Sequence, residues 1–218
     1  MGVLTRAQKT RAREADRISG LPDDVLFDIV TLLPTKDGAR TQVLSSRCSA
    51  DGSEISRVLT AHPGPCRRFV FPHRFPNYDY PTATAIDGCL HHPTLDNLQE
   101  LNVRYYHHGL LPPSVHRFSS TLRVASFCAC VFPDGNNGGA PLLLPVLESL
   151  TLSDIFISES SLHALLAGCR VLQSLVLLET YGLSHRLQIV SASLRNLMVA
   201  SSSEVEVVIQ DAPCLERL

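Results

Sequence analysis

Large apolar residues recur along most of the chain in one spacing, Leu-x-x-Leu-x-Leu or a close variant. Successive copies are 24, 25, 25, 22 and 21 residues apart, and they begin at Leu98, Leu122, Leu147, Leu172, Leu194 and Leu215. A poorer copy, Cys66-x-x-Phe69-x-Phe71, precedes them. Steps of about 20 to 29 residues are typical of leucine-rich repeats, and a chance run of leucines in a helical bundle would not be so regular. The spacing predicts an α/β leucine-rich-repeat solenoid over residues 53–218, open at its C-terminal end.

Each repeat is expected to place one short strand on a concave sheet and to return by a helix or an irregular arc. The segment from Ser158 to Cys169 shows a return helix best, because Leu162, Leu165 and Leu166 recur at helical spacing and Gly168 lies near its end. The chain stops at Leu218, inside a repeat. An array normally needs a capping unit, so we expect a truncated product or a fragment.

The concave face is the predicted binding surface. Side chains alternate along a strand, so the residues that flank each inward leucine face this side. The substrate-binding residues predicted in this way are Asn102, Arg104, Ser126, Thr151, Val176, Leu178 and Met198. The last three predict an exposed apolar patch, which usually marks a partner-binding surface. No acid, base and nucleophile come together on this face, so no catalytic residue is predicted.

The N-terminal part has a different pattern. Residues 1–15 are polar and basic without periodic apolar positions, which predicts a disordered tail. Pro22 with Asp23 and Asp24 suits the first turn of a helix, and apolar residues then recur at helical spacing until Pro34. A second helix is predicted from Thr35 toward Cys48. Two such helices expose too much apolar surface to be stable alone, so they need a partner.

In this segment, both the polar and the apolar residues agree with a known pattern in their order and spacing. The matching stretches are Asp16-Arg-Ile-Ser-x-Leu-Pro-Asp-x-Val-Leu, Leu-Leu-Pro-Thr-Lys-Asp at 32–37 and Arg-Thr-x-Val-Leu-Ser at 40–45. Residues 16–50 thus resemble the F-box of plant F-box/leucine-rich-repeat proteins. The resemblance implies docking onto the Skp-family adaptor of a cullin-RING ubiquitin ligase, through Leu21, Pro22, Val25, Leu26, Ile29, Leu33, Val43 and Leu44.

The chain departs from that family after residue 45. Where the family continues with two tryptophans, residues 46–52 read Ser-Arg-Cys-Ser-Ala-Asp-Gly, and the chain contains no Trp. The third F-box helix is therefore predicted to be degenerate. Loss of a buried aromatic side chain costs about 3–5 kcal/mol in a packed core. A second hypothesis follows: a degenerate or truncated paralogue that acts only as a repeat scaffold, or that has no function.

Composition and charge narrow the classes of function. Hydrophobic residues make up 44% and charged residues 18%, with a net charge of -2, so the chain is expected to fold and not to bind nucleic acid or a membrane surface. Seven cysteines, an odd number, are read as free thiols in a reducing compartment. The N-terminus has no apolar region typical of a secretory signal. We expect a protein of the cytoplasm, the nucleus or both.

Candidate metal and phosphate sites are weak. His91-His92 and His107-His108 are pairs of adjacent residues. Adjacent residues of a strand face opposite sides, so each pair can offer only one ligand to a given metal site. Cys128-x-Cys130 does not complete a tetrahedral set of ligands. The glycine-rich stretch 134–139 lacks the lysine of a phosphate-binding loop and predicts a surface insertion. No metal or cofactor is predicted. The leading hypothesis is a non-enzymatic substrate-recognition subunit of a cullin-RING ligase, with an unknown protein substrate on the repeats.

Overall fold

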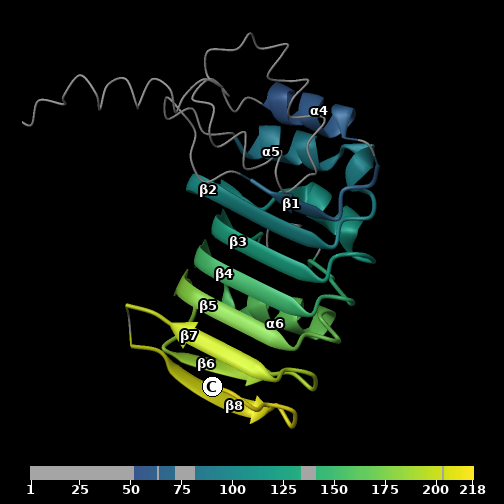
Figure 1. Cartoon of the computed structure of the whole chain (residues 1–218). Coiled ribbons are helices and arrows are strands. Elements are labelled where there is room, and N and C mark those ends of the chain that lie inside the picture. Colours follow the sequence, from purple (N-terminus) through teal and green to yellow (C-terminus); the bar gives the residue numbers. More distant parts are fainter. Residues whose placement is uncertain (1–51, 63, 72–81, 134–140, 203) are drawn as a thin grey trace, which may run out of the picture.

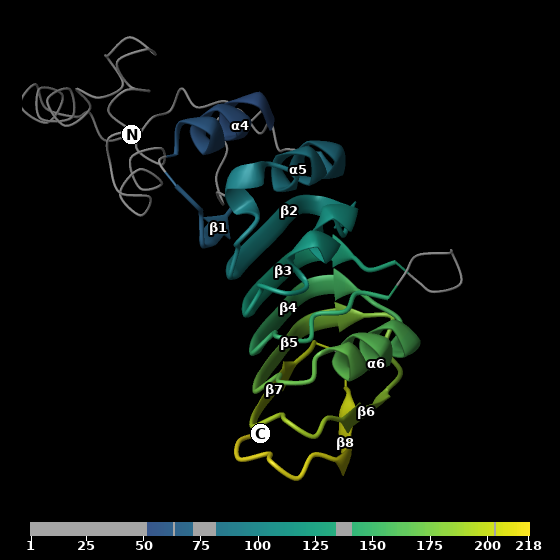
Figure 2. The ribbon, with the colours of Figure 1, turned by 90° about the vertical axis from the view of Figure 1, so that its right-hand side faces the viewer.

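The computed structural model describes residues 52–62, 64–71, 82–133, 141–202 and 204–218. The predicted tail, the F-box with its eight adaptor-docking residues and the glycine-rich stretch 134–139 lie outside these ranges. In the described part, a parallel sheet forms one side, the front, and the helices lie on the other side, the back (Figures 1 and 2). This arrangement confirms the predicted mixed α/β class.

The front sheet consists of strands in chain order, apart from β6, which lies elsewhere. Its six described strands are β1 (Arg68–Val70), β2 (Glu100–Leu110), β3 (Val124–Val131), β4 (Ser149–Phe156), β5 (Ser174–Tyr181) and β7 (Asn196–Ala200). All of the neighbouring pairs are parallel. Each strand begins within one predicted copy of the leucine motif, so the repeat assignment is confirmed.

The register of the front sheet follows from the leucine motif. The first leucines of the five full copies, Leu98, Leu122, Leu147, Leu172 and Leu194, are fully buried. The fourth positions pair across the sheet as Phe69, Leu101, Ala125, Leu150, Leu175 and Leu197. Because every strand turns the same motif positions inward, neighbouring repeats bury their apolar side chains against each other.

One backbone carbonyl before each strand joins consecutive repeats. The acceptors are the carbonyls of Arg67, Gln99, Arg123, Glu148, Gln173 and Arg195, and each accepts two N–H groups of the following repeat at 2.7–3.1 Å. The last of these steps reaches Glu216 and Arg217, and Arg217 forms a parallel bridge with Asn196. The sixth copy that opens at Leu215 therefore continues the same geometry.

The back of the repeats varies along the chain. It begins with α4 (Gly52–Ala61), α5 (Ala83–Leu90) and two 3-10 helices, η2 (Pro93–Leu95) and η3 (Pro113–Phe118). The predicted return helix is confirmed as α6 (Glu159–Gly168), which Ser158 caps and which buries Leu162, Leu165 and Leu166. The last returns instead form a small parallel sheet of β6 (Arg186–Val190) and β8 (Glu206–Asp211) (Figure 2).

Candidate protein-binding surface

The seven predicted substrate-binding residues lie on the outer face, which is the side of the front sheet that points away from the core. One row across the strands contains Asn102, Ser126, Thr151, Val176 and Met198, in register. The next row contains Arg104, Cys128, Ser153, Leu178 and Ala200. The alternation of side chains along the strands accounts for these two rows, and their role in substrate binding stays a prediction.

Exposure differs along these two rows. Met198 is 58% exposed, whereas Val176 and Leu178 are half-buried and Cys128 is buried. The predicted apolar patch is therefore less exposed at β5 than at β7. Arg104 of β2 is exposed, and at the start of this strand Glu100 Oε2 lies 3.2 Å from Arg68 Nε of β1. Within these two rows, Arg104 gives β2 a charged residue, whereas the residues of β5 and β7 are apolar.

Regular alternation ends just beyond the second row. Among the described residues, those other than glycine with a positive φ are Ala129, Asp154 and Glu179, at 54°, 54° and 48°. They follow Cys128, Ser153 and Leu178, so they occupy the same place in three neighbouring strands. The resulting kink turns Ile155 and Thr180 into the core and leaves Phe156 and Tyr181 exposed. These two aromatic residues were missed, because Ala and Glu carry no signal for a left-handed backbone and Asp only a weak one.

Strand β2 reaches the same end of the sheet by a larger irregularity. Its register with β3 jumps from Arg104–Cys128 to Gly109–Cys130, so residues 105–108 oppose Ala129 alone. Tyr105 is buried, and its hydroxyl donates to the Leu110 carbonyl at 2.9 Å. Gly109 fits closely under the Tyr105 ring, where a Cβ would lie 2.7 Å from the ring. The assumption of a regular strand at His107-His108 is therefore wrong, and both histidines are exposed.

His108, Phe156 and Tyr181 form a cluster, named the aromatic cluster below. Phe156 and Tyr181 stack with ring centroids 4.9 Å apart and an interplanar angle of 29°. The His108 ring meets Phe156 edge-on at 4.8 Å and Tyr181 at 6.5 Å. His108 Nε2 lies 3.3 Å from Asp154 Oδ1. His108 thus joins β2 to β4 and β5 on the outer face.

Glu179 adds a carboxylate beside this cluster. Its Oε2 accepts hydrogen bonds from the backbone N–H and the hydroxyl of Ser202, at 3.0 and 2.7 Å. Both bonds favour the charged form, so they lower the pKa of Glu179 below its ordinary value. Glu179 therefore stays ionised at neutral pH.

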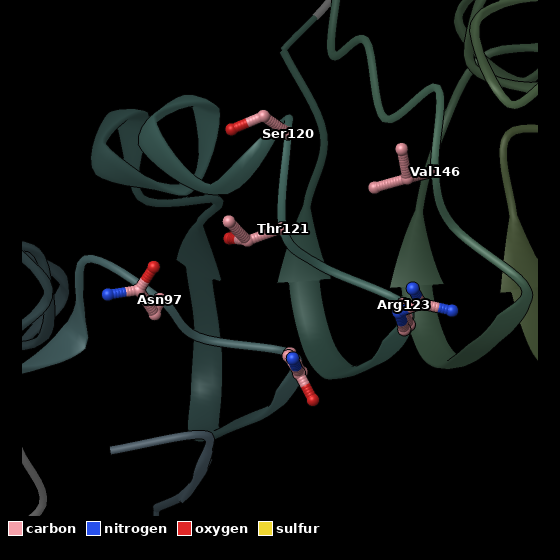
Figure 3. Close-up of a pocket in the computed structure, with 6 residues that line it drawn as sticks. Asn97, Ser120, Thr121, Arg123 and Val146 are labelled. Atoms are coloured by element: carbon pink, nitrogen blue, oxygen red, sulfur yellow. The ribbon is translucent and has the colours of Figure 1, made fainter. Parts of the chain in front are cut away.

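A pocket of about 170 Å³ lies at the opposite end of the strands (Figure 3). It is lined by Asn97, Gln99, Ser120, Thr121, Arg123 and Val146. Small-molecule sites usually occupy about 300–1,000 Å³ and are mostly apolar. Arg123 is also held in an ion pair with Glu148 at 2.6 Å. The pocket is too small and too polar to be the principal ligand site.

Cysteine and histidine chemistry is limited in the described part. Six described cysteines are free thiols, of which Cys214 is exposed and the others are buried. Burial raises the pKa of Cys130 far above its ordinary value and that of Cys169 to about 11, so neither forms a reactive thiolate. His91 and His92 contact the Asp87 carbonyl and the Thr60 hydroxyl. Within the described ranges no group of three metal-ligating side chains exists.

The fold and its outer face define a leucine-rich-repeat protein. Comparison with known proteins identifies the family within this class. A family model described as "FBD-associated F-box protein At5g56370, LRR repeats" matches residues 86–218. The chain belongs to this plant F-box/leucine-rich-repeat family. In the part of the chain that the structure describes, no helix is long and apolar enough to cross a membrane.

Curated relatives from Arabidopsis thaliana carry matching names. F-box/FBD/LRR-repeat protein At1g51370 is 25% identical over 95% of this chain and 50% of its own length. FBD-associated F-box protein At4g10400 is 28% identical over 92% of this chain and 54% of its own length. This chain spans about half the length of these relatives. Their names indicate no enzyme family, and no solved structure matches the chain.

Proposed function

We propose that the protein is the substrate-recognition subunit of a cullin-RING ubiquitin ligase in the cytoplasm, the nucleus or both. In this proposal an N-terminal F-box docks the Skp-family adaptor, and through it a cullin, while a leucine-rich-repeat solenoid holds a protein substrate. The observation that carries the proposal is membership of the F-box/leucine-rich-repeat family across residues 86–218. Ubiquitin transfer would then be accelerated by proximity, and its chemistry would belong to other subunits.

The outer face suits a protein partner. Its two predicted rows offer polar groups at β2 to β4 and apolar groups at β5 and β7, and the aromatic cluster lies beside them. Interfaces are enriched in Tyr, Phe, Met and Arg relative to the rest of the surface. The substrate surface proposed here is therefore the predicted residues from Asn102 to Met198 together with Phe156 and Tyr181.

The absence of Trp from the sequence favours a second candidate, a repeat scaffold whose degenerate F-box no longer docks the adaptor. Calorimetric titration of the full chain with a plant Skp-family adaptor separates the two. Micromolar or tighter binding, abolished by the double variant Leu21→Asp, Ile29→Asp, would support the receptor. The matched control is Leu143→Asp, Val171→Asp, which places the same charges at exposed positions of the repeats.

Circular dichroism of each sample verifies that it is folded before the titration. A folded wild-type chain that does not bind the adaptor would overturn the receptor proposal. If the control variant lost as much adaptor binding, the loss would come from the added negative charge and not from its position in the F-box. That result would also count against the proposed docking surface.

A further inference from the structure

The aromatic cluster lies at the end of an exposed apolar row. Leu110, Val131, Phe156 and Tyr181 pair in register across β2 to β5. Phe156 is 43% exposed and Tyr181 39% exposed. Stacking covers one face of each ring and leaves the other face free of the partner ring, and an aromatic face attracts cations as well as apolar groups. More than half of the surface of each residue is covered by the protein, so the rings are held in place before any partner arrives.

The surroundings of the cluster limit its movement. Tyr105 is anchored in the core and fixes the irregular segment of β2 from which His108 extends. His108 then packs edge-on against Phe156 and reaches Asp154. A site that is ordered in advance loses less entropy on binding.

The strands β4, β5 and β7 carry charges of one sign beside the cluster. In the described strands β4, β5 and β7, the charged residues are Asp154 and Glu179, both acidic. Both occupy the kink next to the aromatic pair, and Ser202 holds Glu179 by two hydrogen bonds. The basic residues of the outer face, Arg68 and Arg104, lie on β1 and β2. The charge of this half of the face is complementary to a cation.

We propose that Phe156 and Tyr181, with Asp154 and Glu179, hold an arginine or lysine side chain of an extended basic segment in a protein partner. The cation would lie against the stacked rings, and the carboxylates would accept its N–H groups. Arginine fits best, because its planar guanidinium can stack on a ring and donate to a carboxylate at the same time. This inference rests on the receptor function proposed above and names the class of substrate.

A nuclear magnetic resonance titration of the isotope-labelled full chain tests the proposal. The probe is the nine-residue peptide (Gly-Ser-Arg)₃, and the comparison peptide has citrulline in place of each arginine, which keeps the shape and removes the charge. We expect saturable shifts confined to residues around Asp154, Phe156, Glu179 and Tyr181. The citrulline peptide is expected to bind at least about tenfold more weakly, which corresponds to about 1.4 kcal/mol.

Two variants separate the contributions. Asp154→Asn, Glu179→Gln removes the charges with little change of shape, and Tyr181→Ala removes half of the ring pair. Each is expected to weaken binding of the arginine peptide at least fivefold. Glu100→Gln is the matched control, since it removes an outer-face carboxylate on β2 and is expected to change the affinity less than twofold.

Equal binding of the two peptides, shifts located elsewhere, or no shifts in a folded sample would overturn the inference. Shifts of the same residues that depend on protein concentration without peptide would show a second copy as the occupant, and would also overturn it. The adaptor titration is a separate readout. Adaptor binding without peptide binding leaves the receptor standing and removes this site, and the reverse result leaves a basic-peptide site without a ligase.

Discussion

Along the front sheet, the five junctions between described strands keep one register for the inward residues, whereas the back changes its structure from one repeat to the next. Repeats return by 3-10 helices, by α6 or by the strands β6 and β8. Both sides cover the same core. The register of the inward residues is therefore uniform along the front, whereas the structure of the returns on the back is not. Each repeat nevertheless contributes to both sides.

The difference lies in where the backbone hydrogen bonds go. Every front strand depends on its neighbours for its bonds, so one displaced strand would leave buried N–H and C=O groups unpaired. Helix α6 satisfies most of its own backbone and has only to bury Leu162, Leu165 and Leu166. Register constrains the front, and burial alone constrains most of the back.

The largest effect is expected from a cavity in the front core. Leu152 is fully buried and pairs in register with Phe127 and Leu177. Leu152→Ala is expected to lower the free energy of unfolding by about 2–5 kcal/mol, measured by urea denaturation. Ser153→Ala, on the outer face of the same strand, is the control and should change it by less than about 0.5 kcal/mol. If both variants lost a similar amount of unfolding free energy, the inward row would not be the main source of stability.

The junction between front and back gives the next effect. Gly182 follows β5 with φ of 88°, and a Cβ there would lie 2.9 Å from the Ile157 carbonyl oxygen. Gly182→Ala is expected to destabilise the fold by about 1–3 kcal/mol. Gly88 lies on the back in α5, and a Cβ there would meet nothing within 4 Å, so Gly88→Ala should instead stabilise by about 0.5–1 kcal/mol. Thermal denaturation measures both effects. If the melting temperatures of the two variants moved in the same direction, the predicted difference between Gly182 and Gly88 would be wrong.

A smaller effect is expected at the start of α6 on the back. The Ser158 hydroxyl accepts the N–H of Ser161 at 3.3 Å. Ser158→Ala is expected to destabilise by about 1 kcal/mol, and Ser158→Asp, which keeps a capping oxygen, to restore most of the loss. Urea denaturation of the three proteins measures both steps. If Ser158→Asp were as unstable as Ser158→Ala, capping would not explain the position of this helix.

The smallest effect concerns the ion pairs at the N-terminal ends of the front strands. Arg123 Nη1 and Glu148 Oε1 are 2.6 Å apart, and both side chains are largely exposed. A double-mutant cycle with Arg123→Ala and Glu148→Ala is expected to give a coupling energy of about 0.2–1 kcal/mol. The coupling should fall in about 1 M salt, because salt screens exposed charges. A larger coupling that resists salt would mean that this pair, and not the backbone, sets the register.

Much of the front was predictable from the sequence, because leucines at Leu150 and Leu175 and at their equivalents can be buried together in one way only. The same alternation placed Thr151 and Val176 on the outer face. It failed beyond Ser153 and Leu178, since the kink at Asp154 and Glu179 is formed by residues other than glycine and breaks the alternation. Phe156 and Tyr181 were therefore missed.

The back was predictable only where its local signals were strong. Ser158 with the leucines of α6 carries a cap and a helical period, and this helix was found. Strand β6 alternates apolar Leu187 and Ile189 with polar residues, which is the period of a strand, yet a helix or arc was expected for every return. Its partner β8 lies one repeat later, so the pairing follows from the repeat and not from either segment alone.

The carbonyl before each front strand, from Arg67 to Arg195, also bears on how such genes change. Each one forms the same two bonds with the next repeat whatever its own side chain is. Duplication or deletion of a whole unit within a gene would therefore conserve these two front-sheet bonds at each remaining junction. The number of repeats can then vary among related proteins while the bonds that join them stay the same. A new order of existing units would give a new outer face.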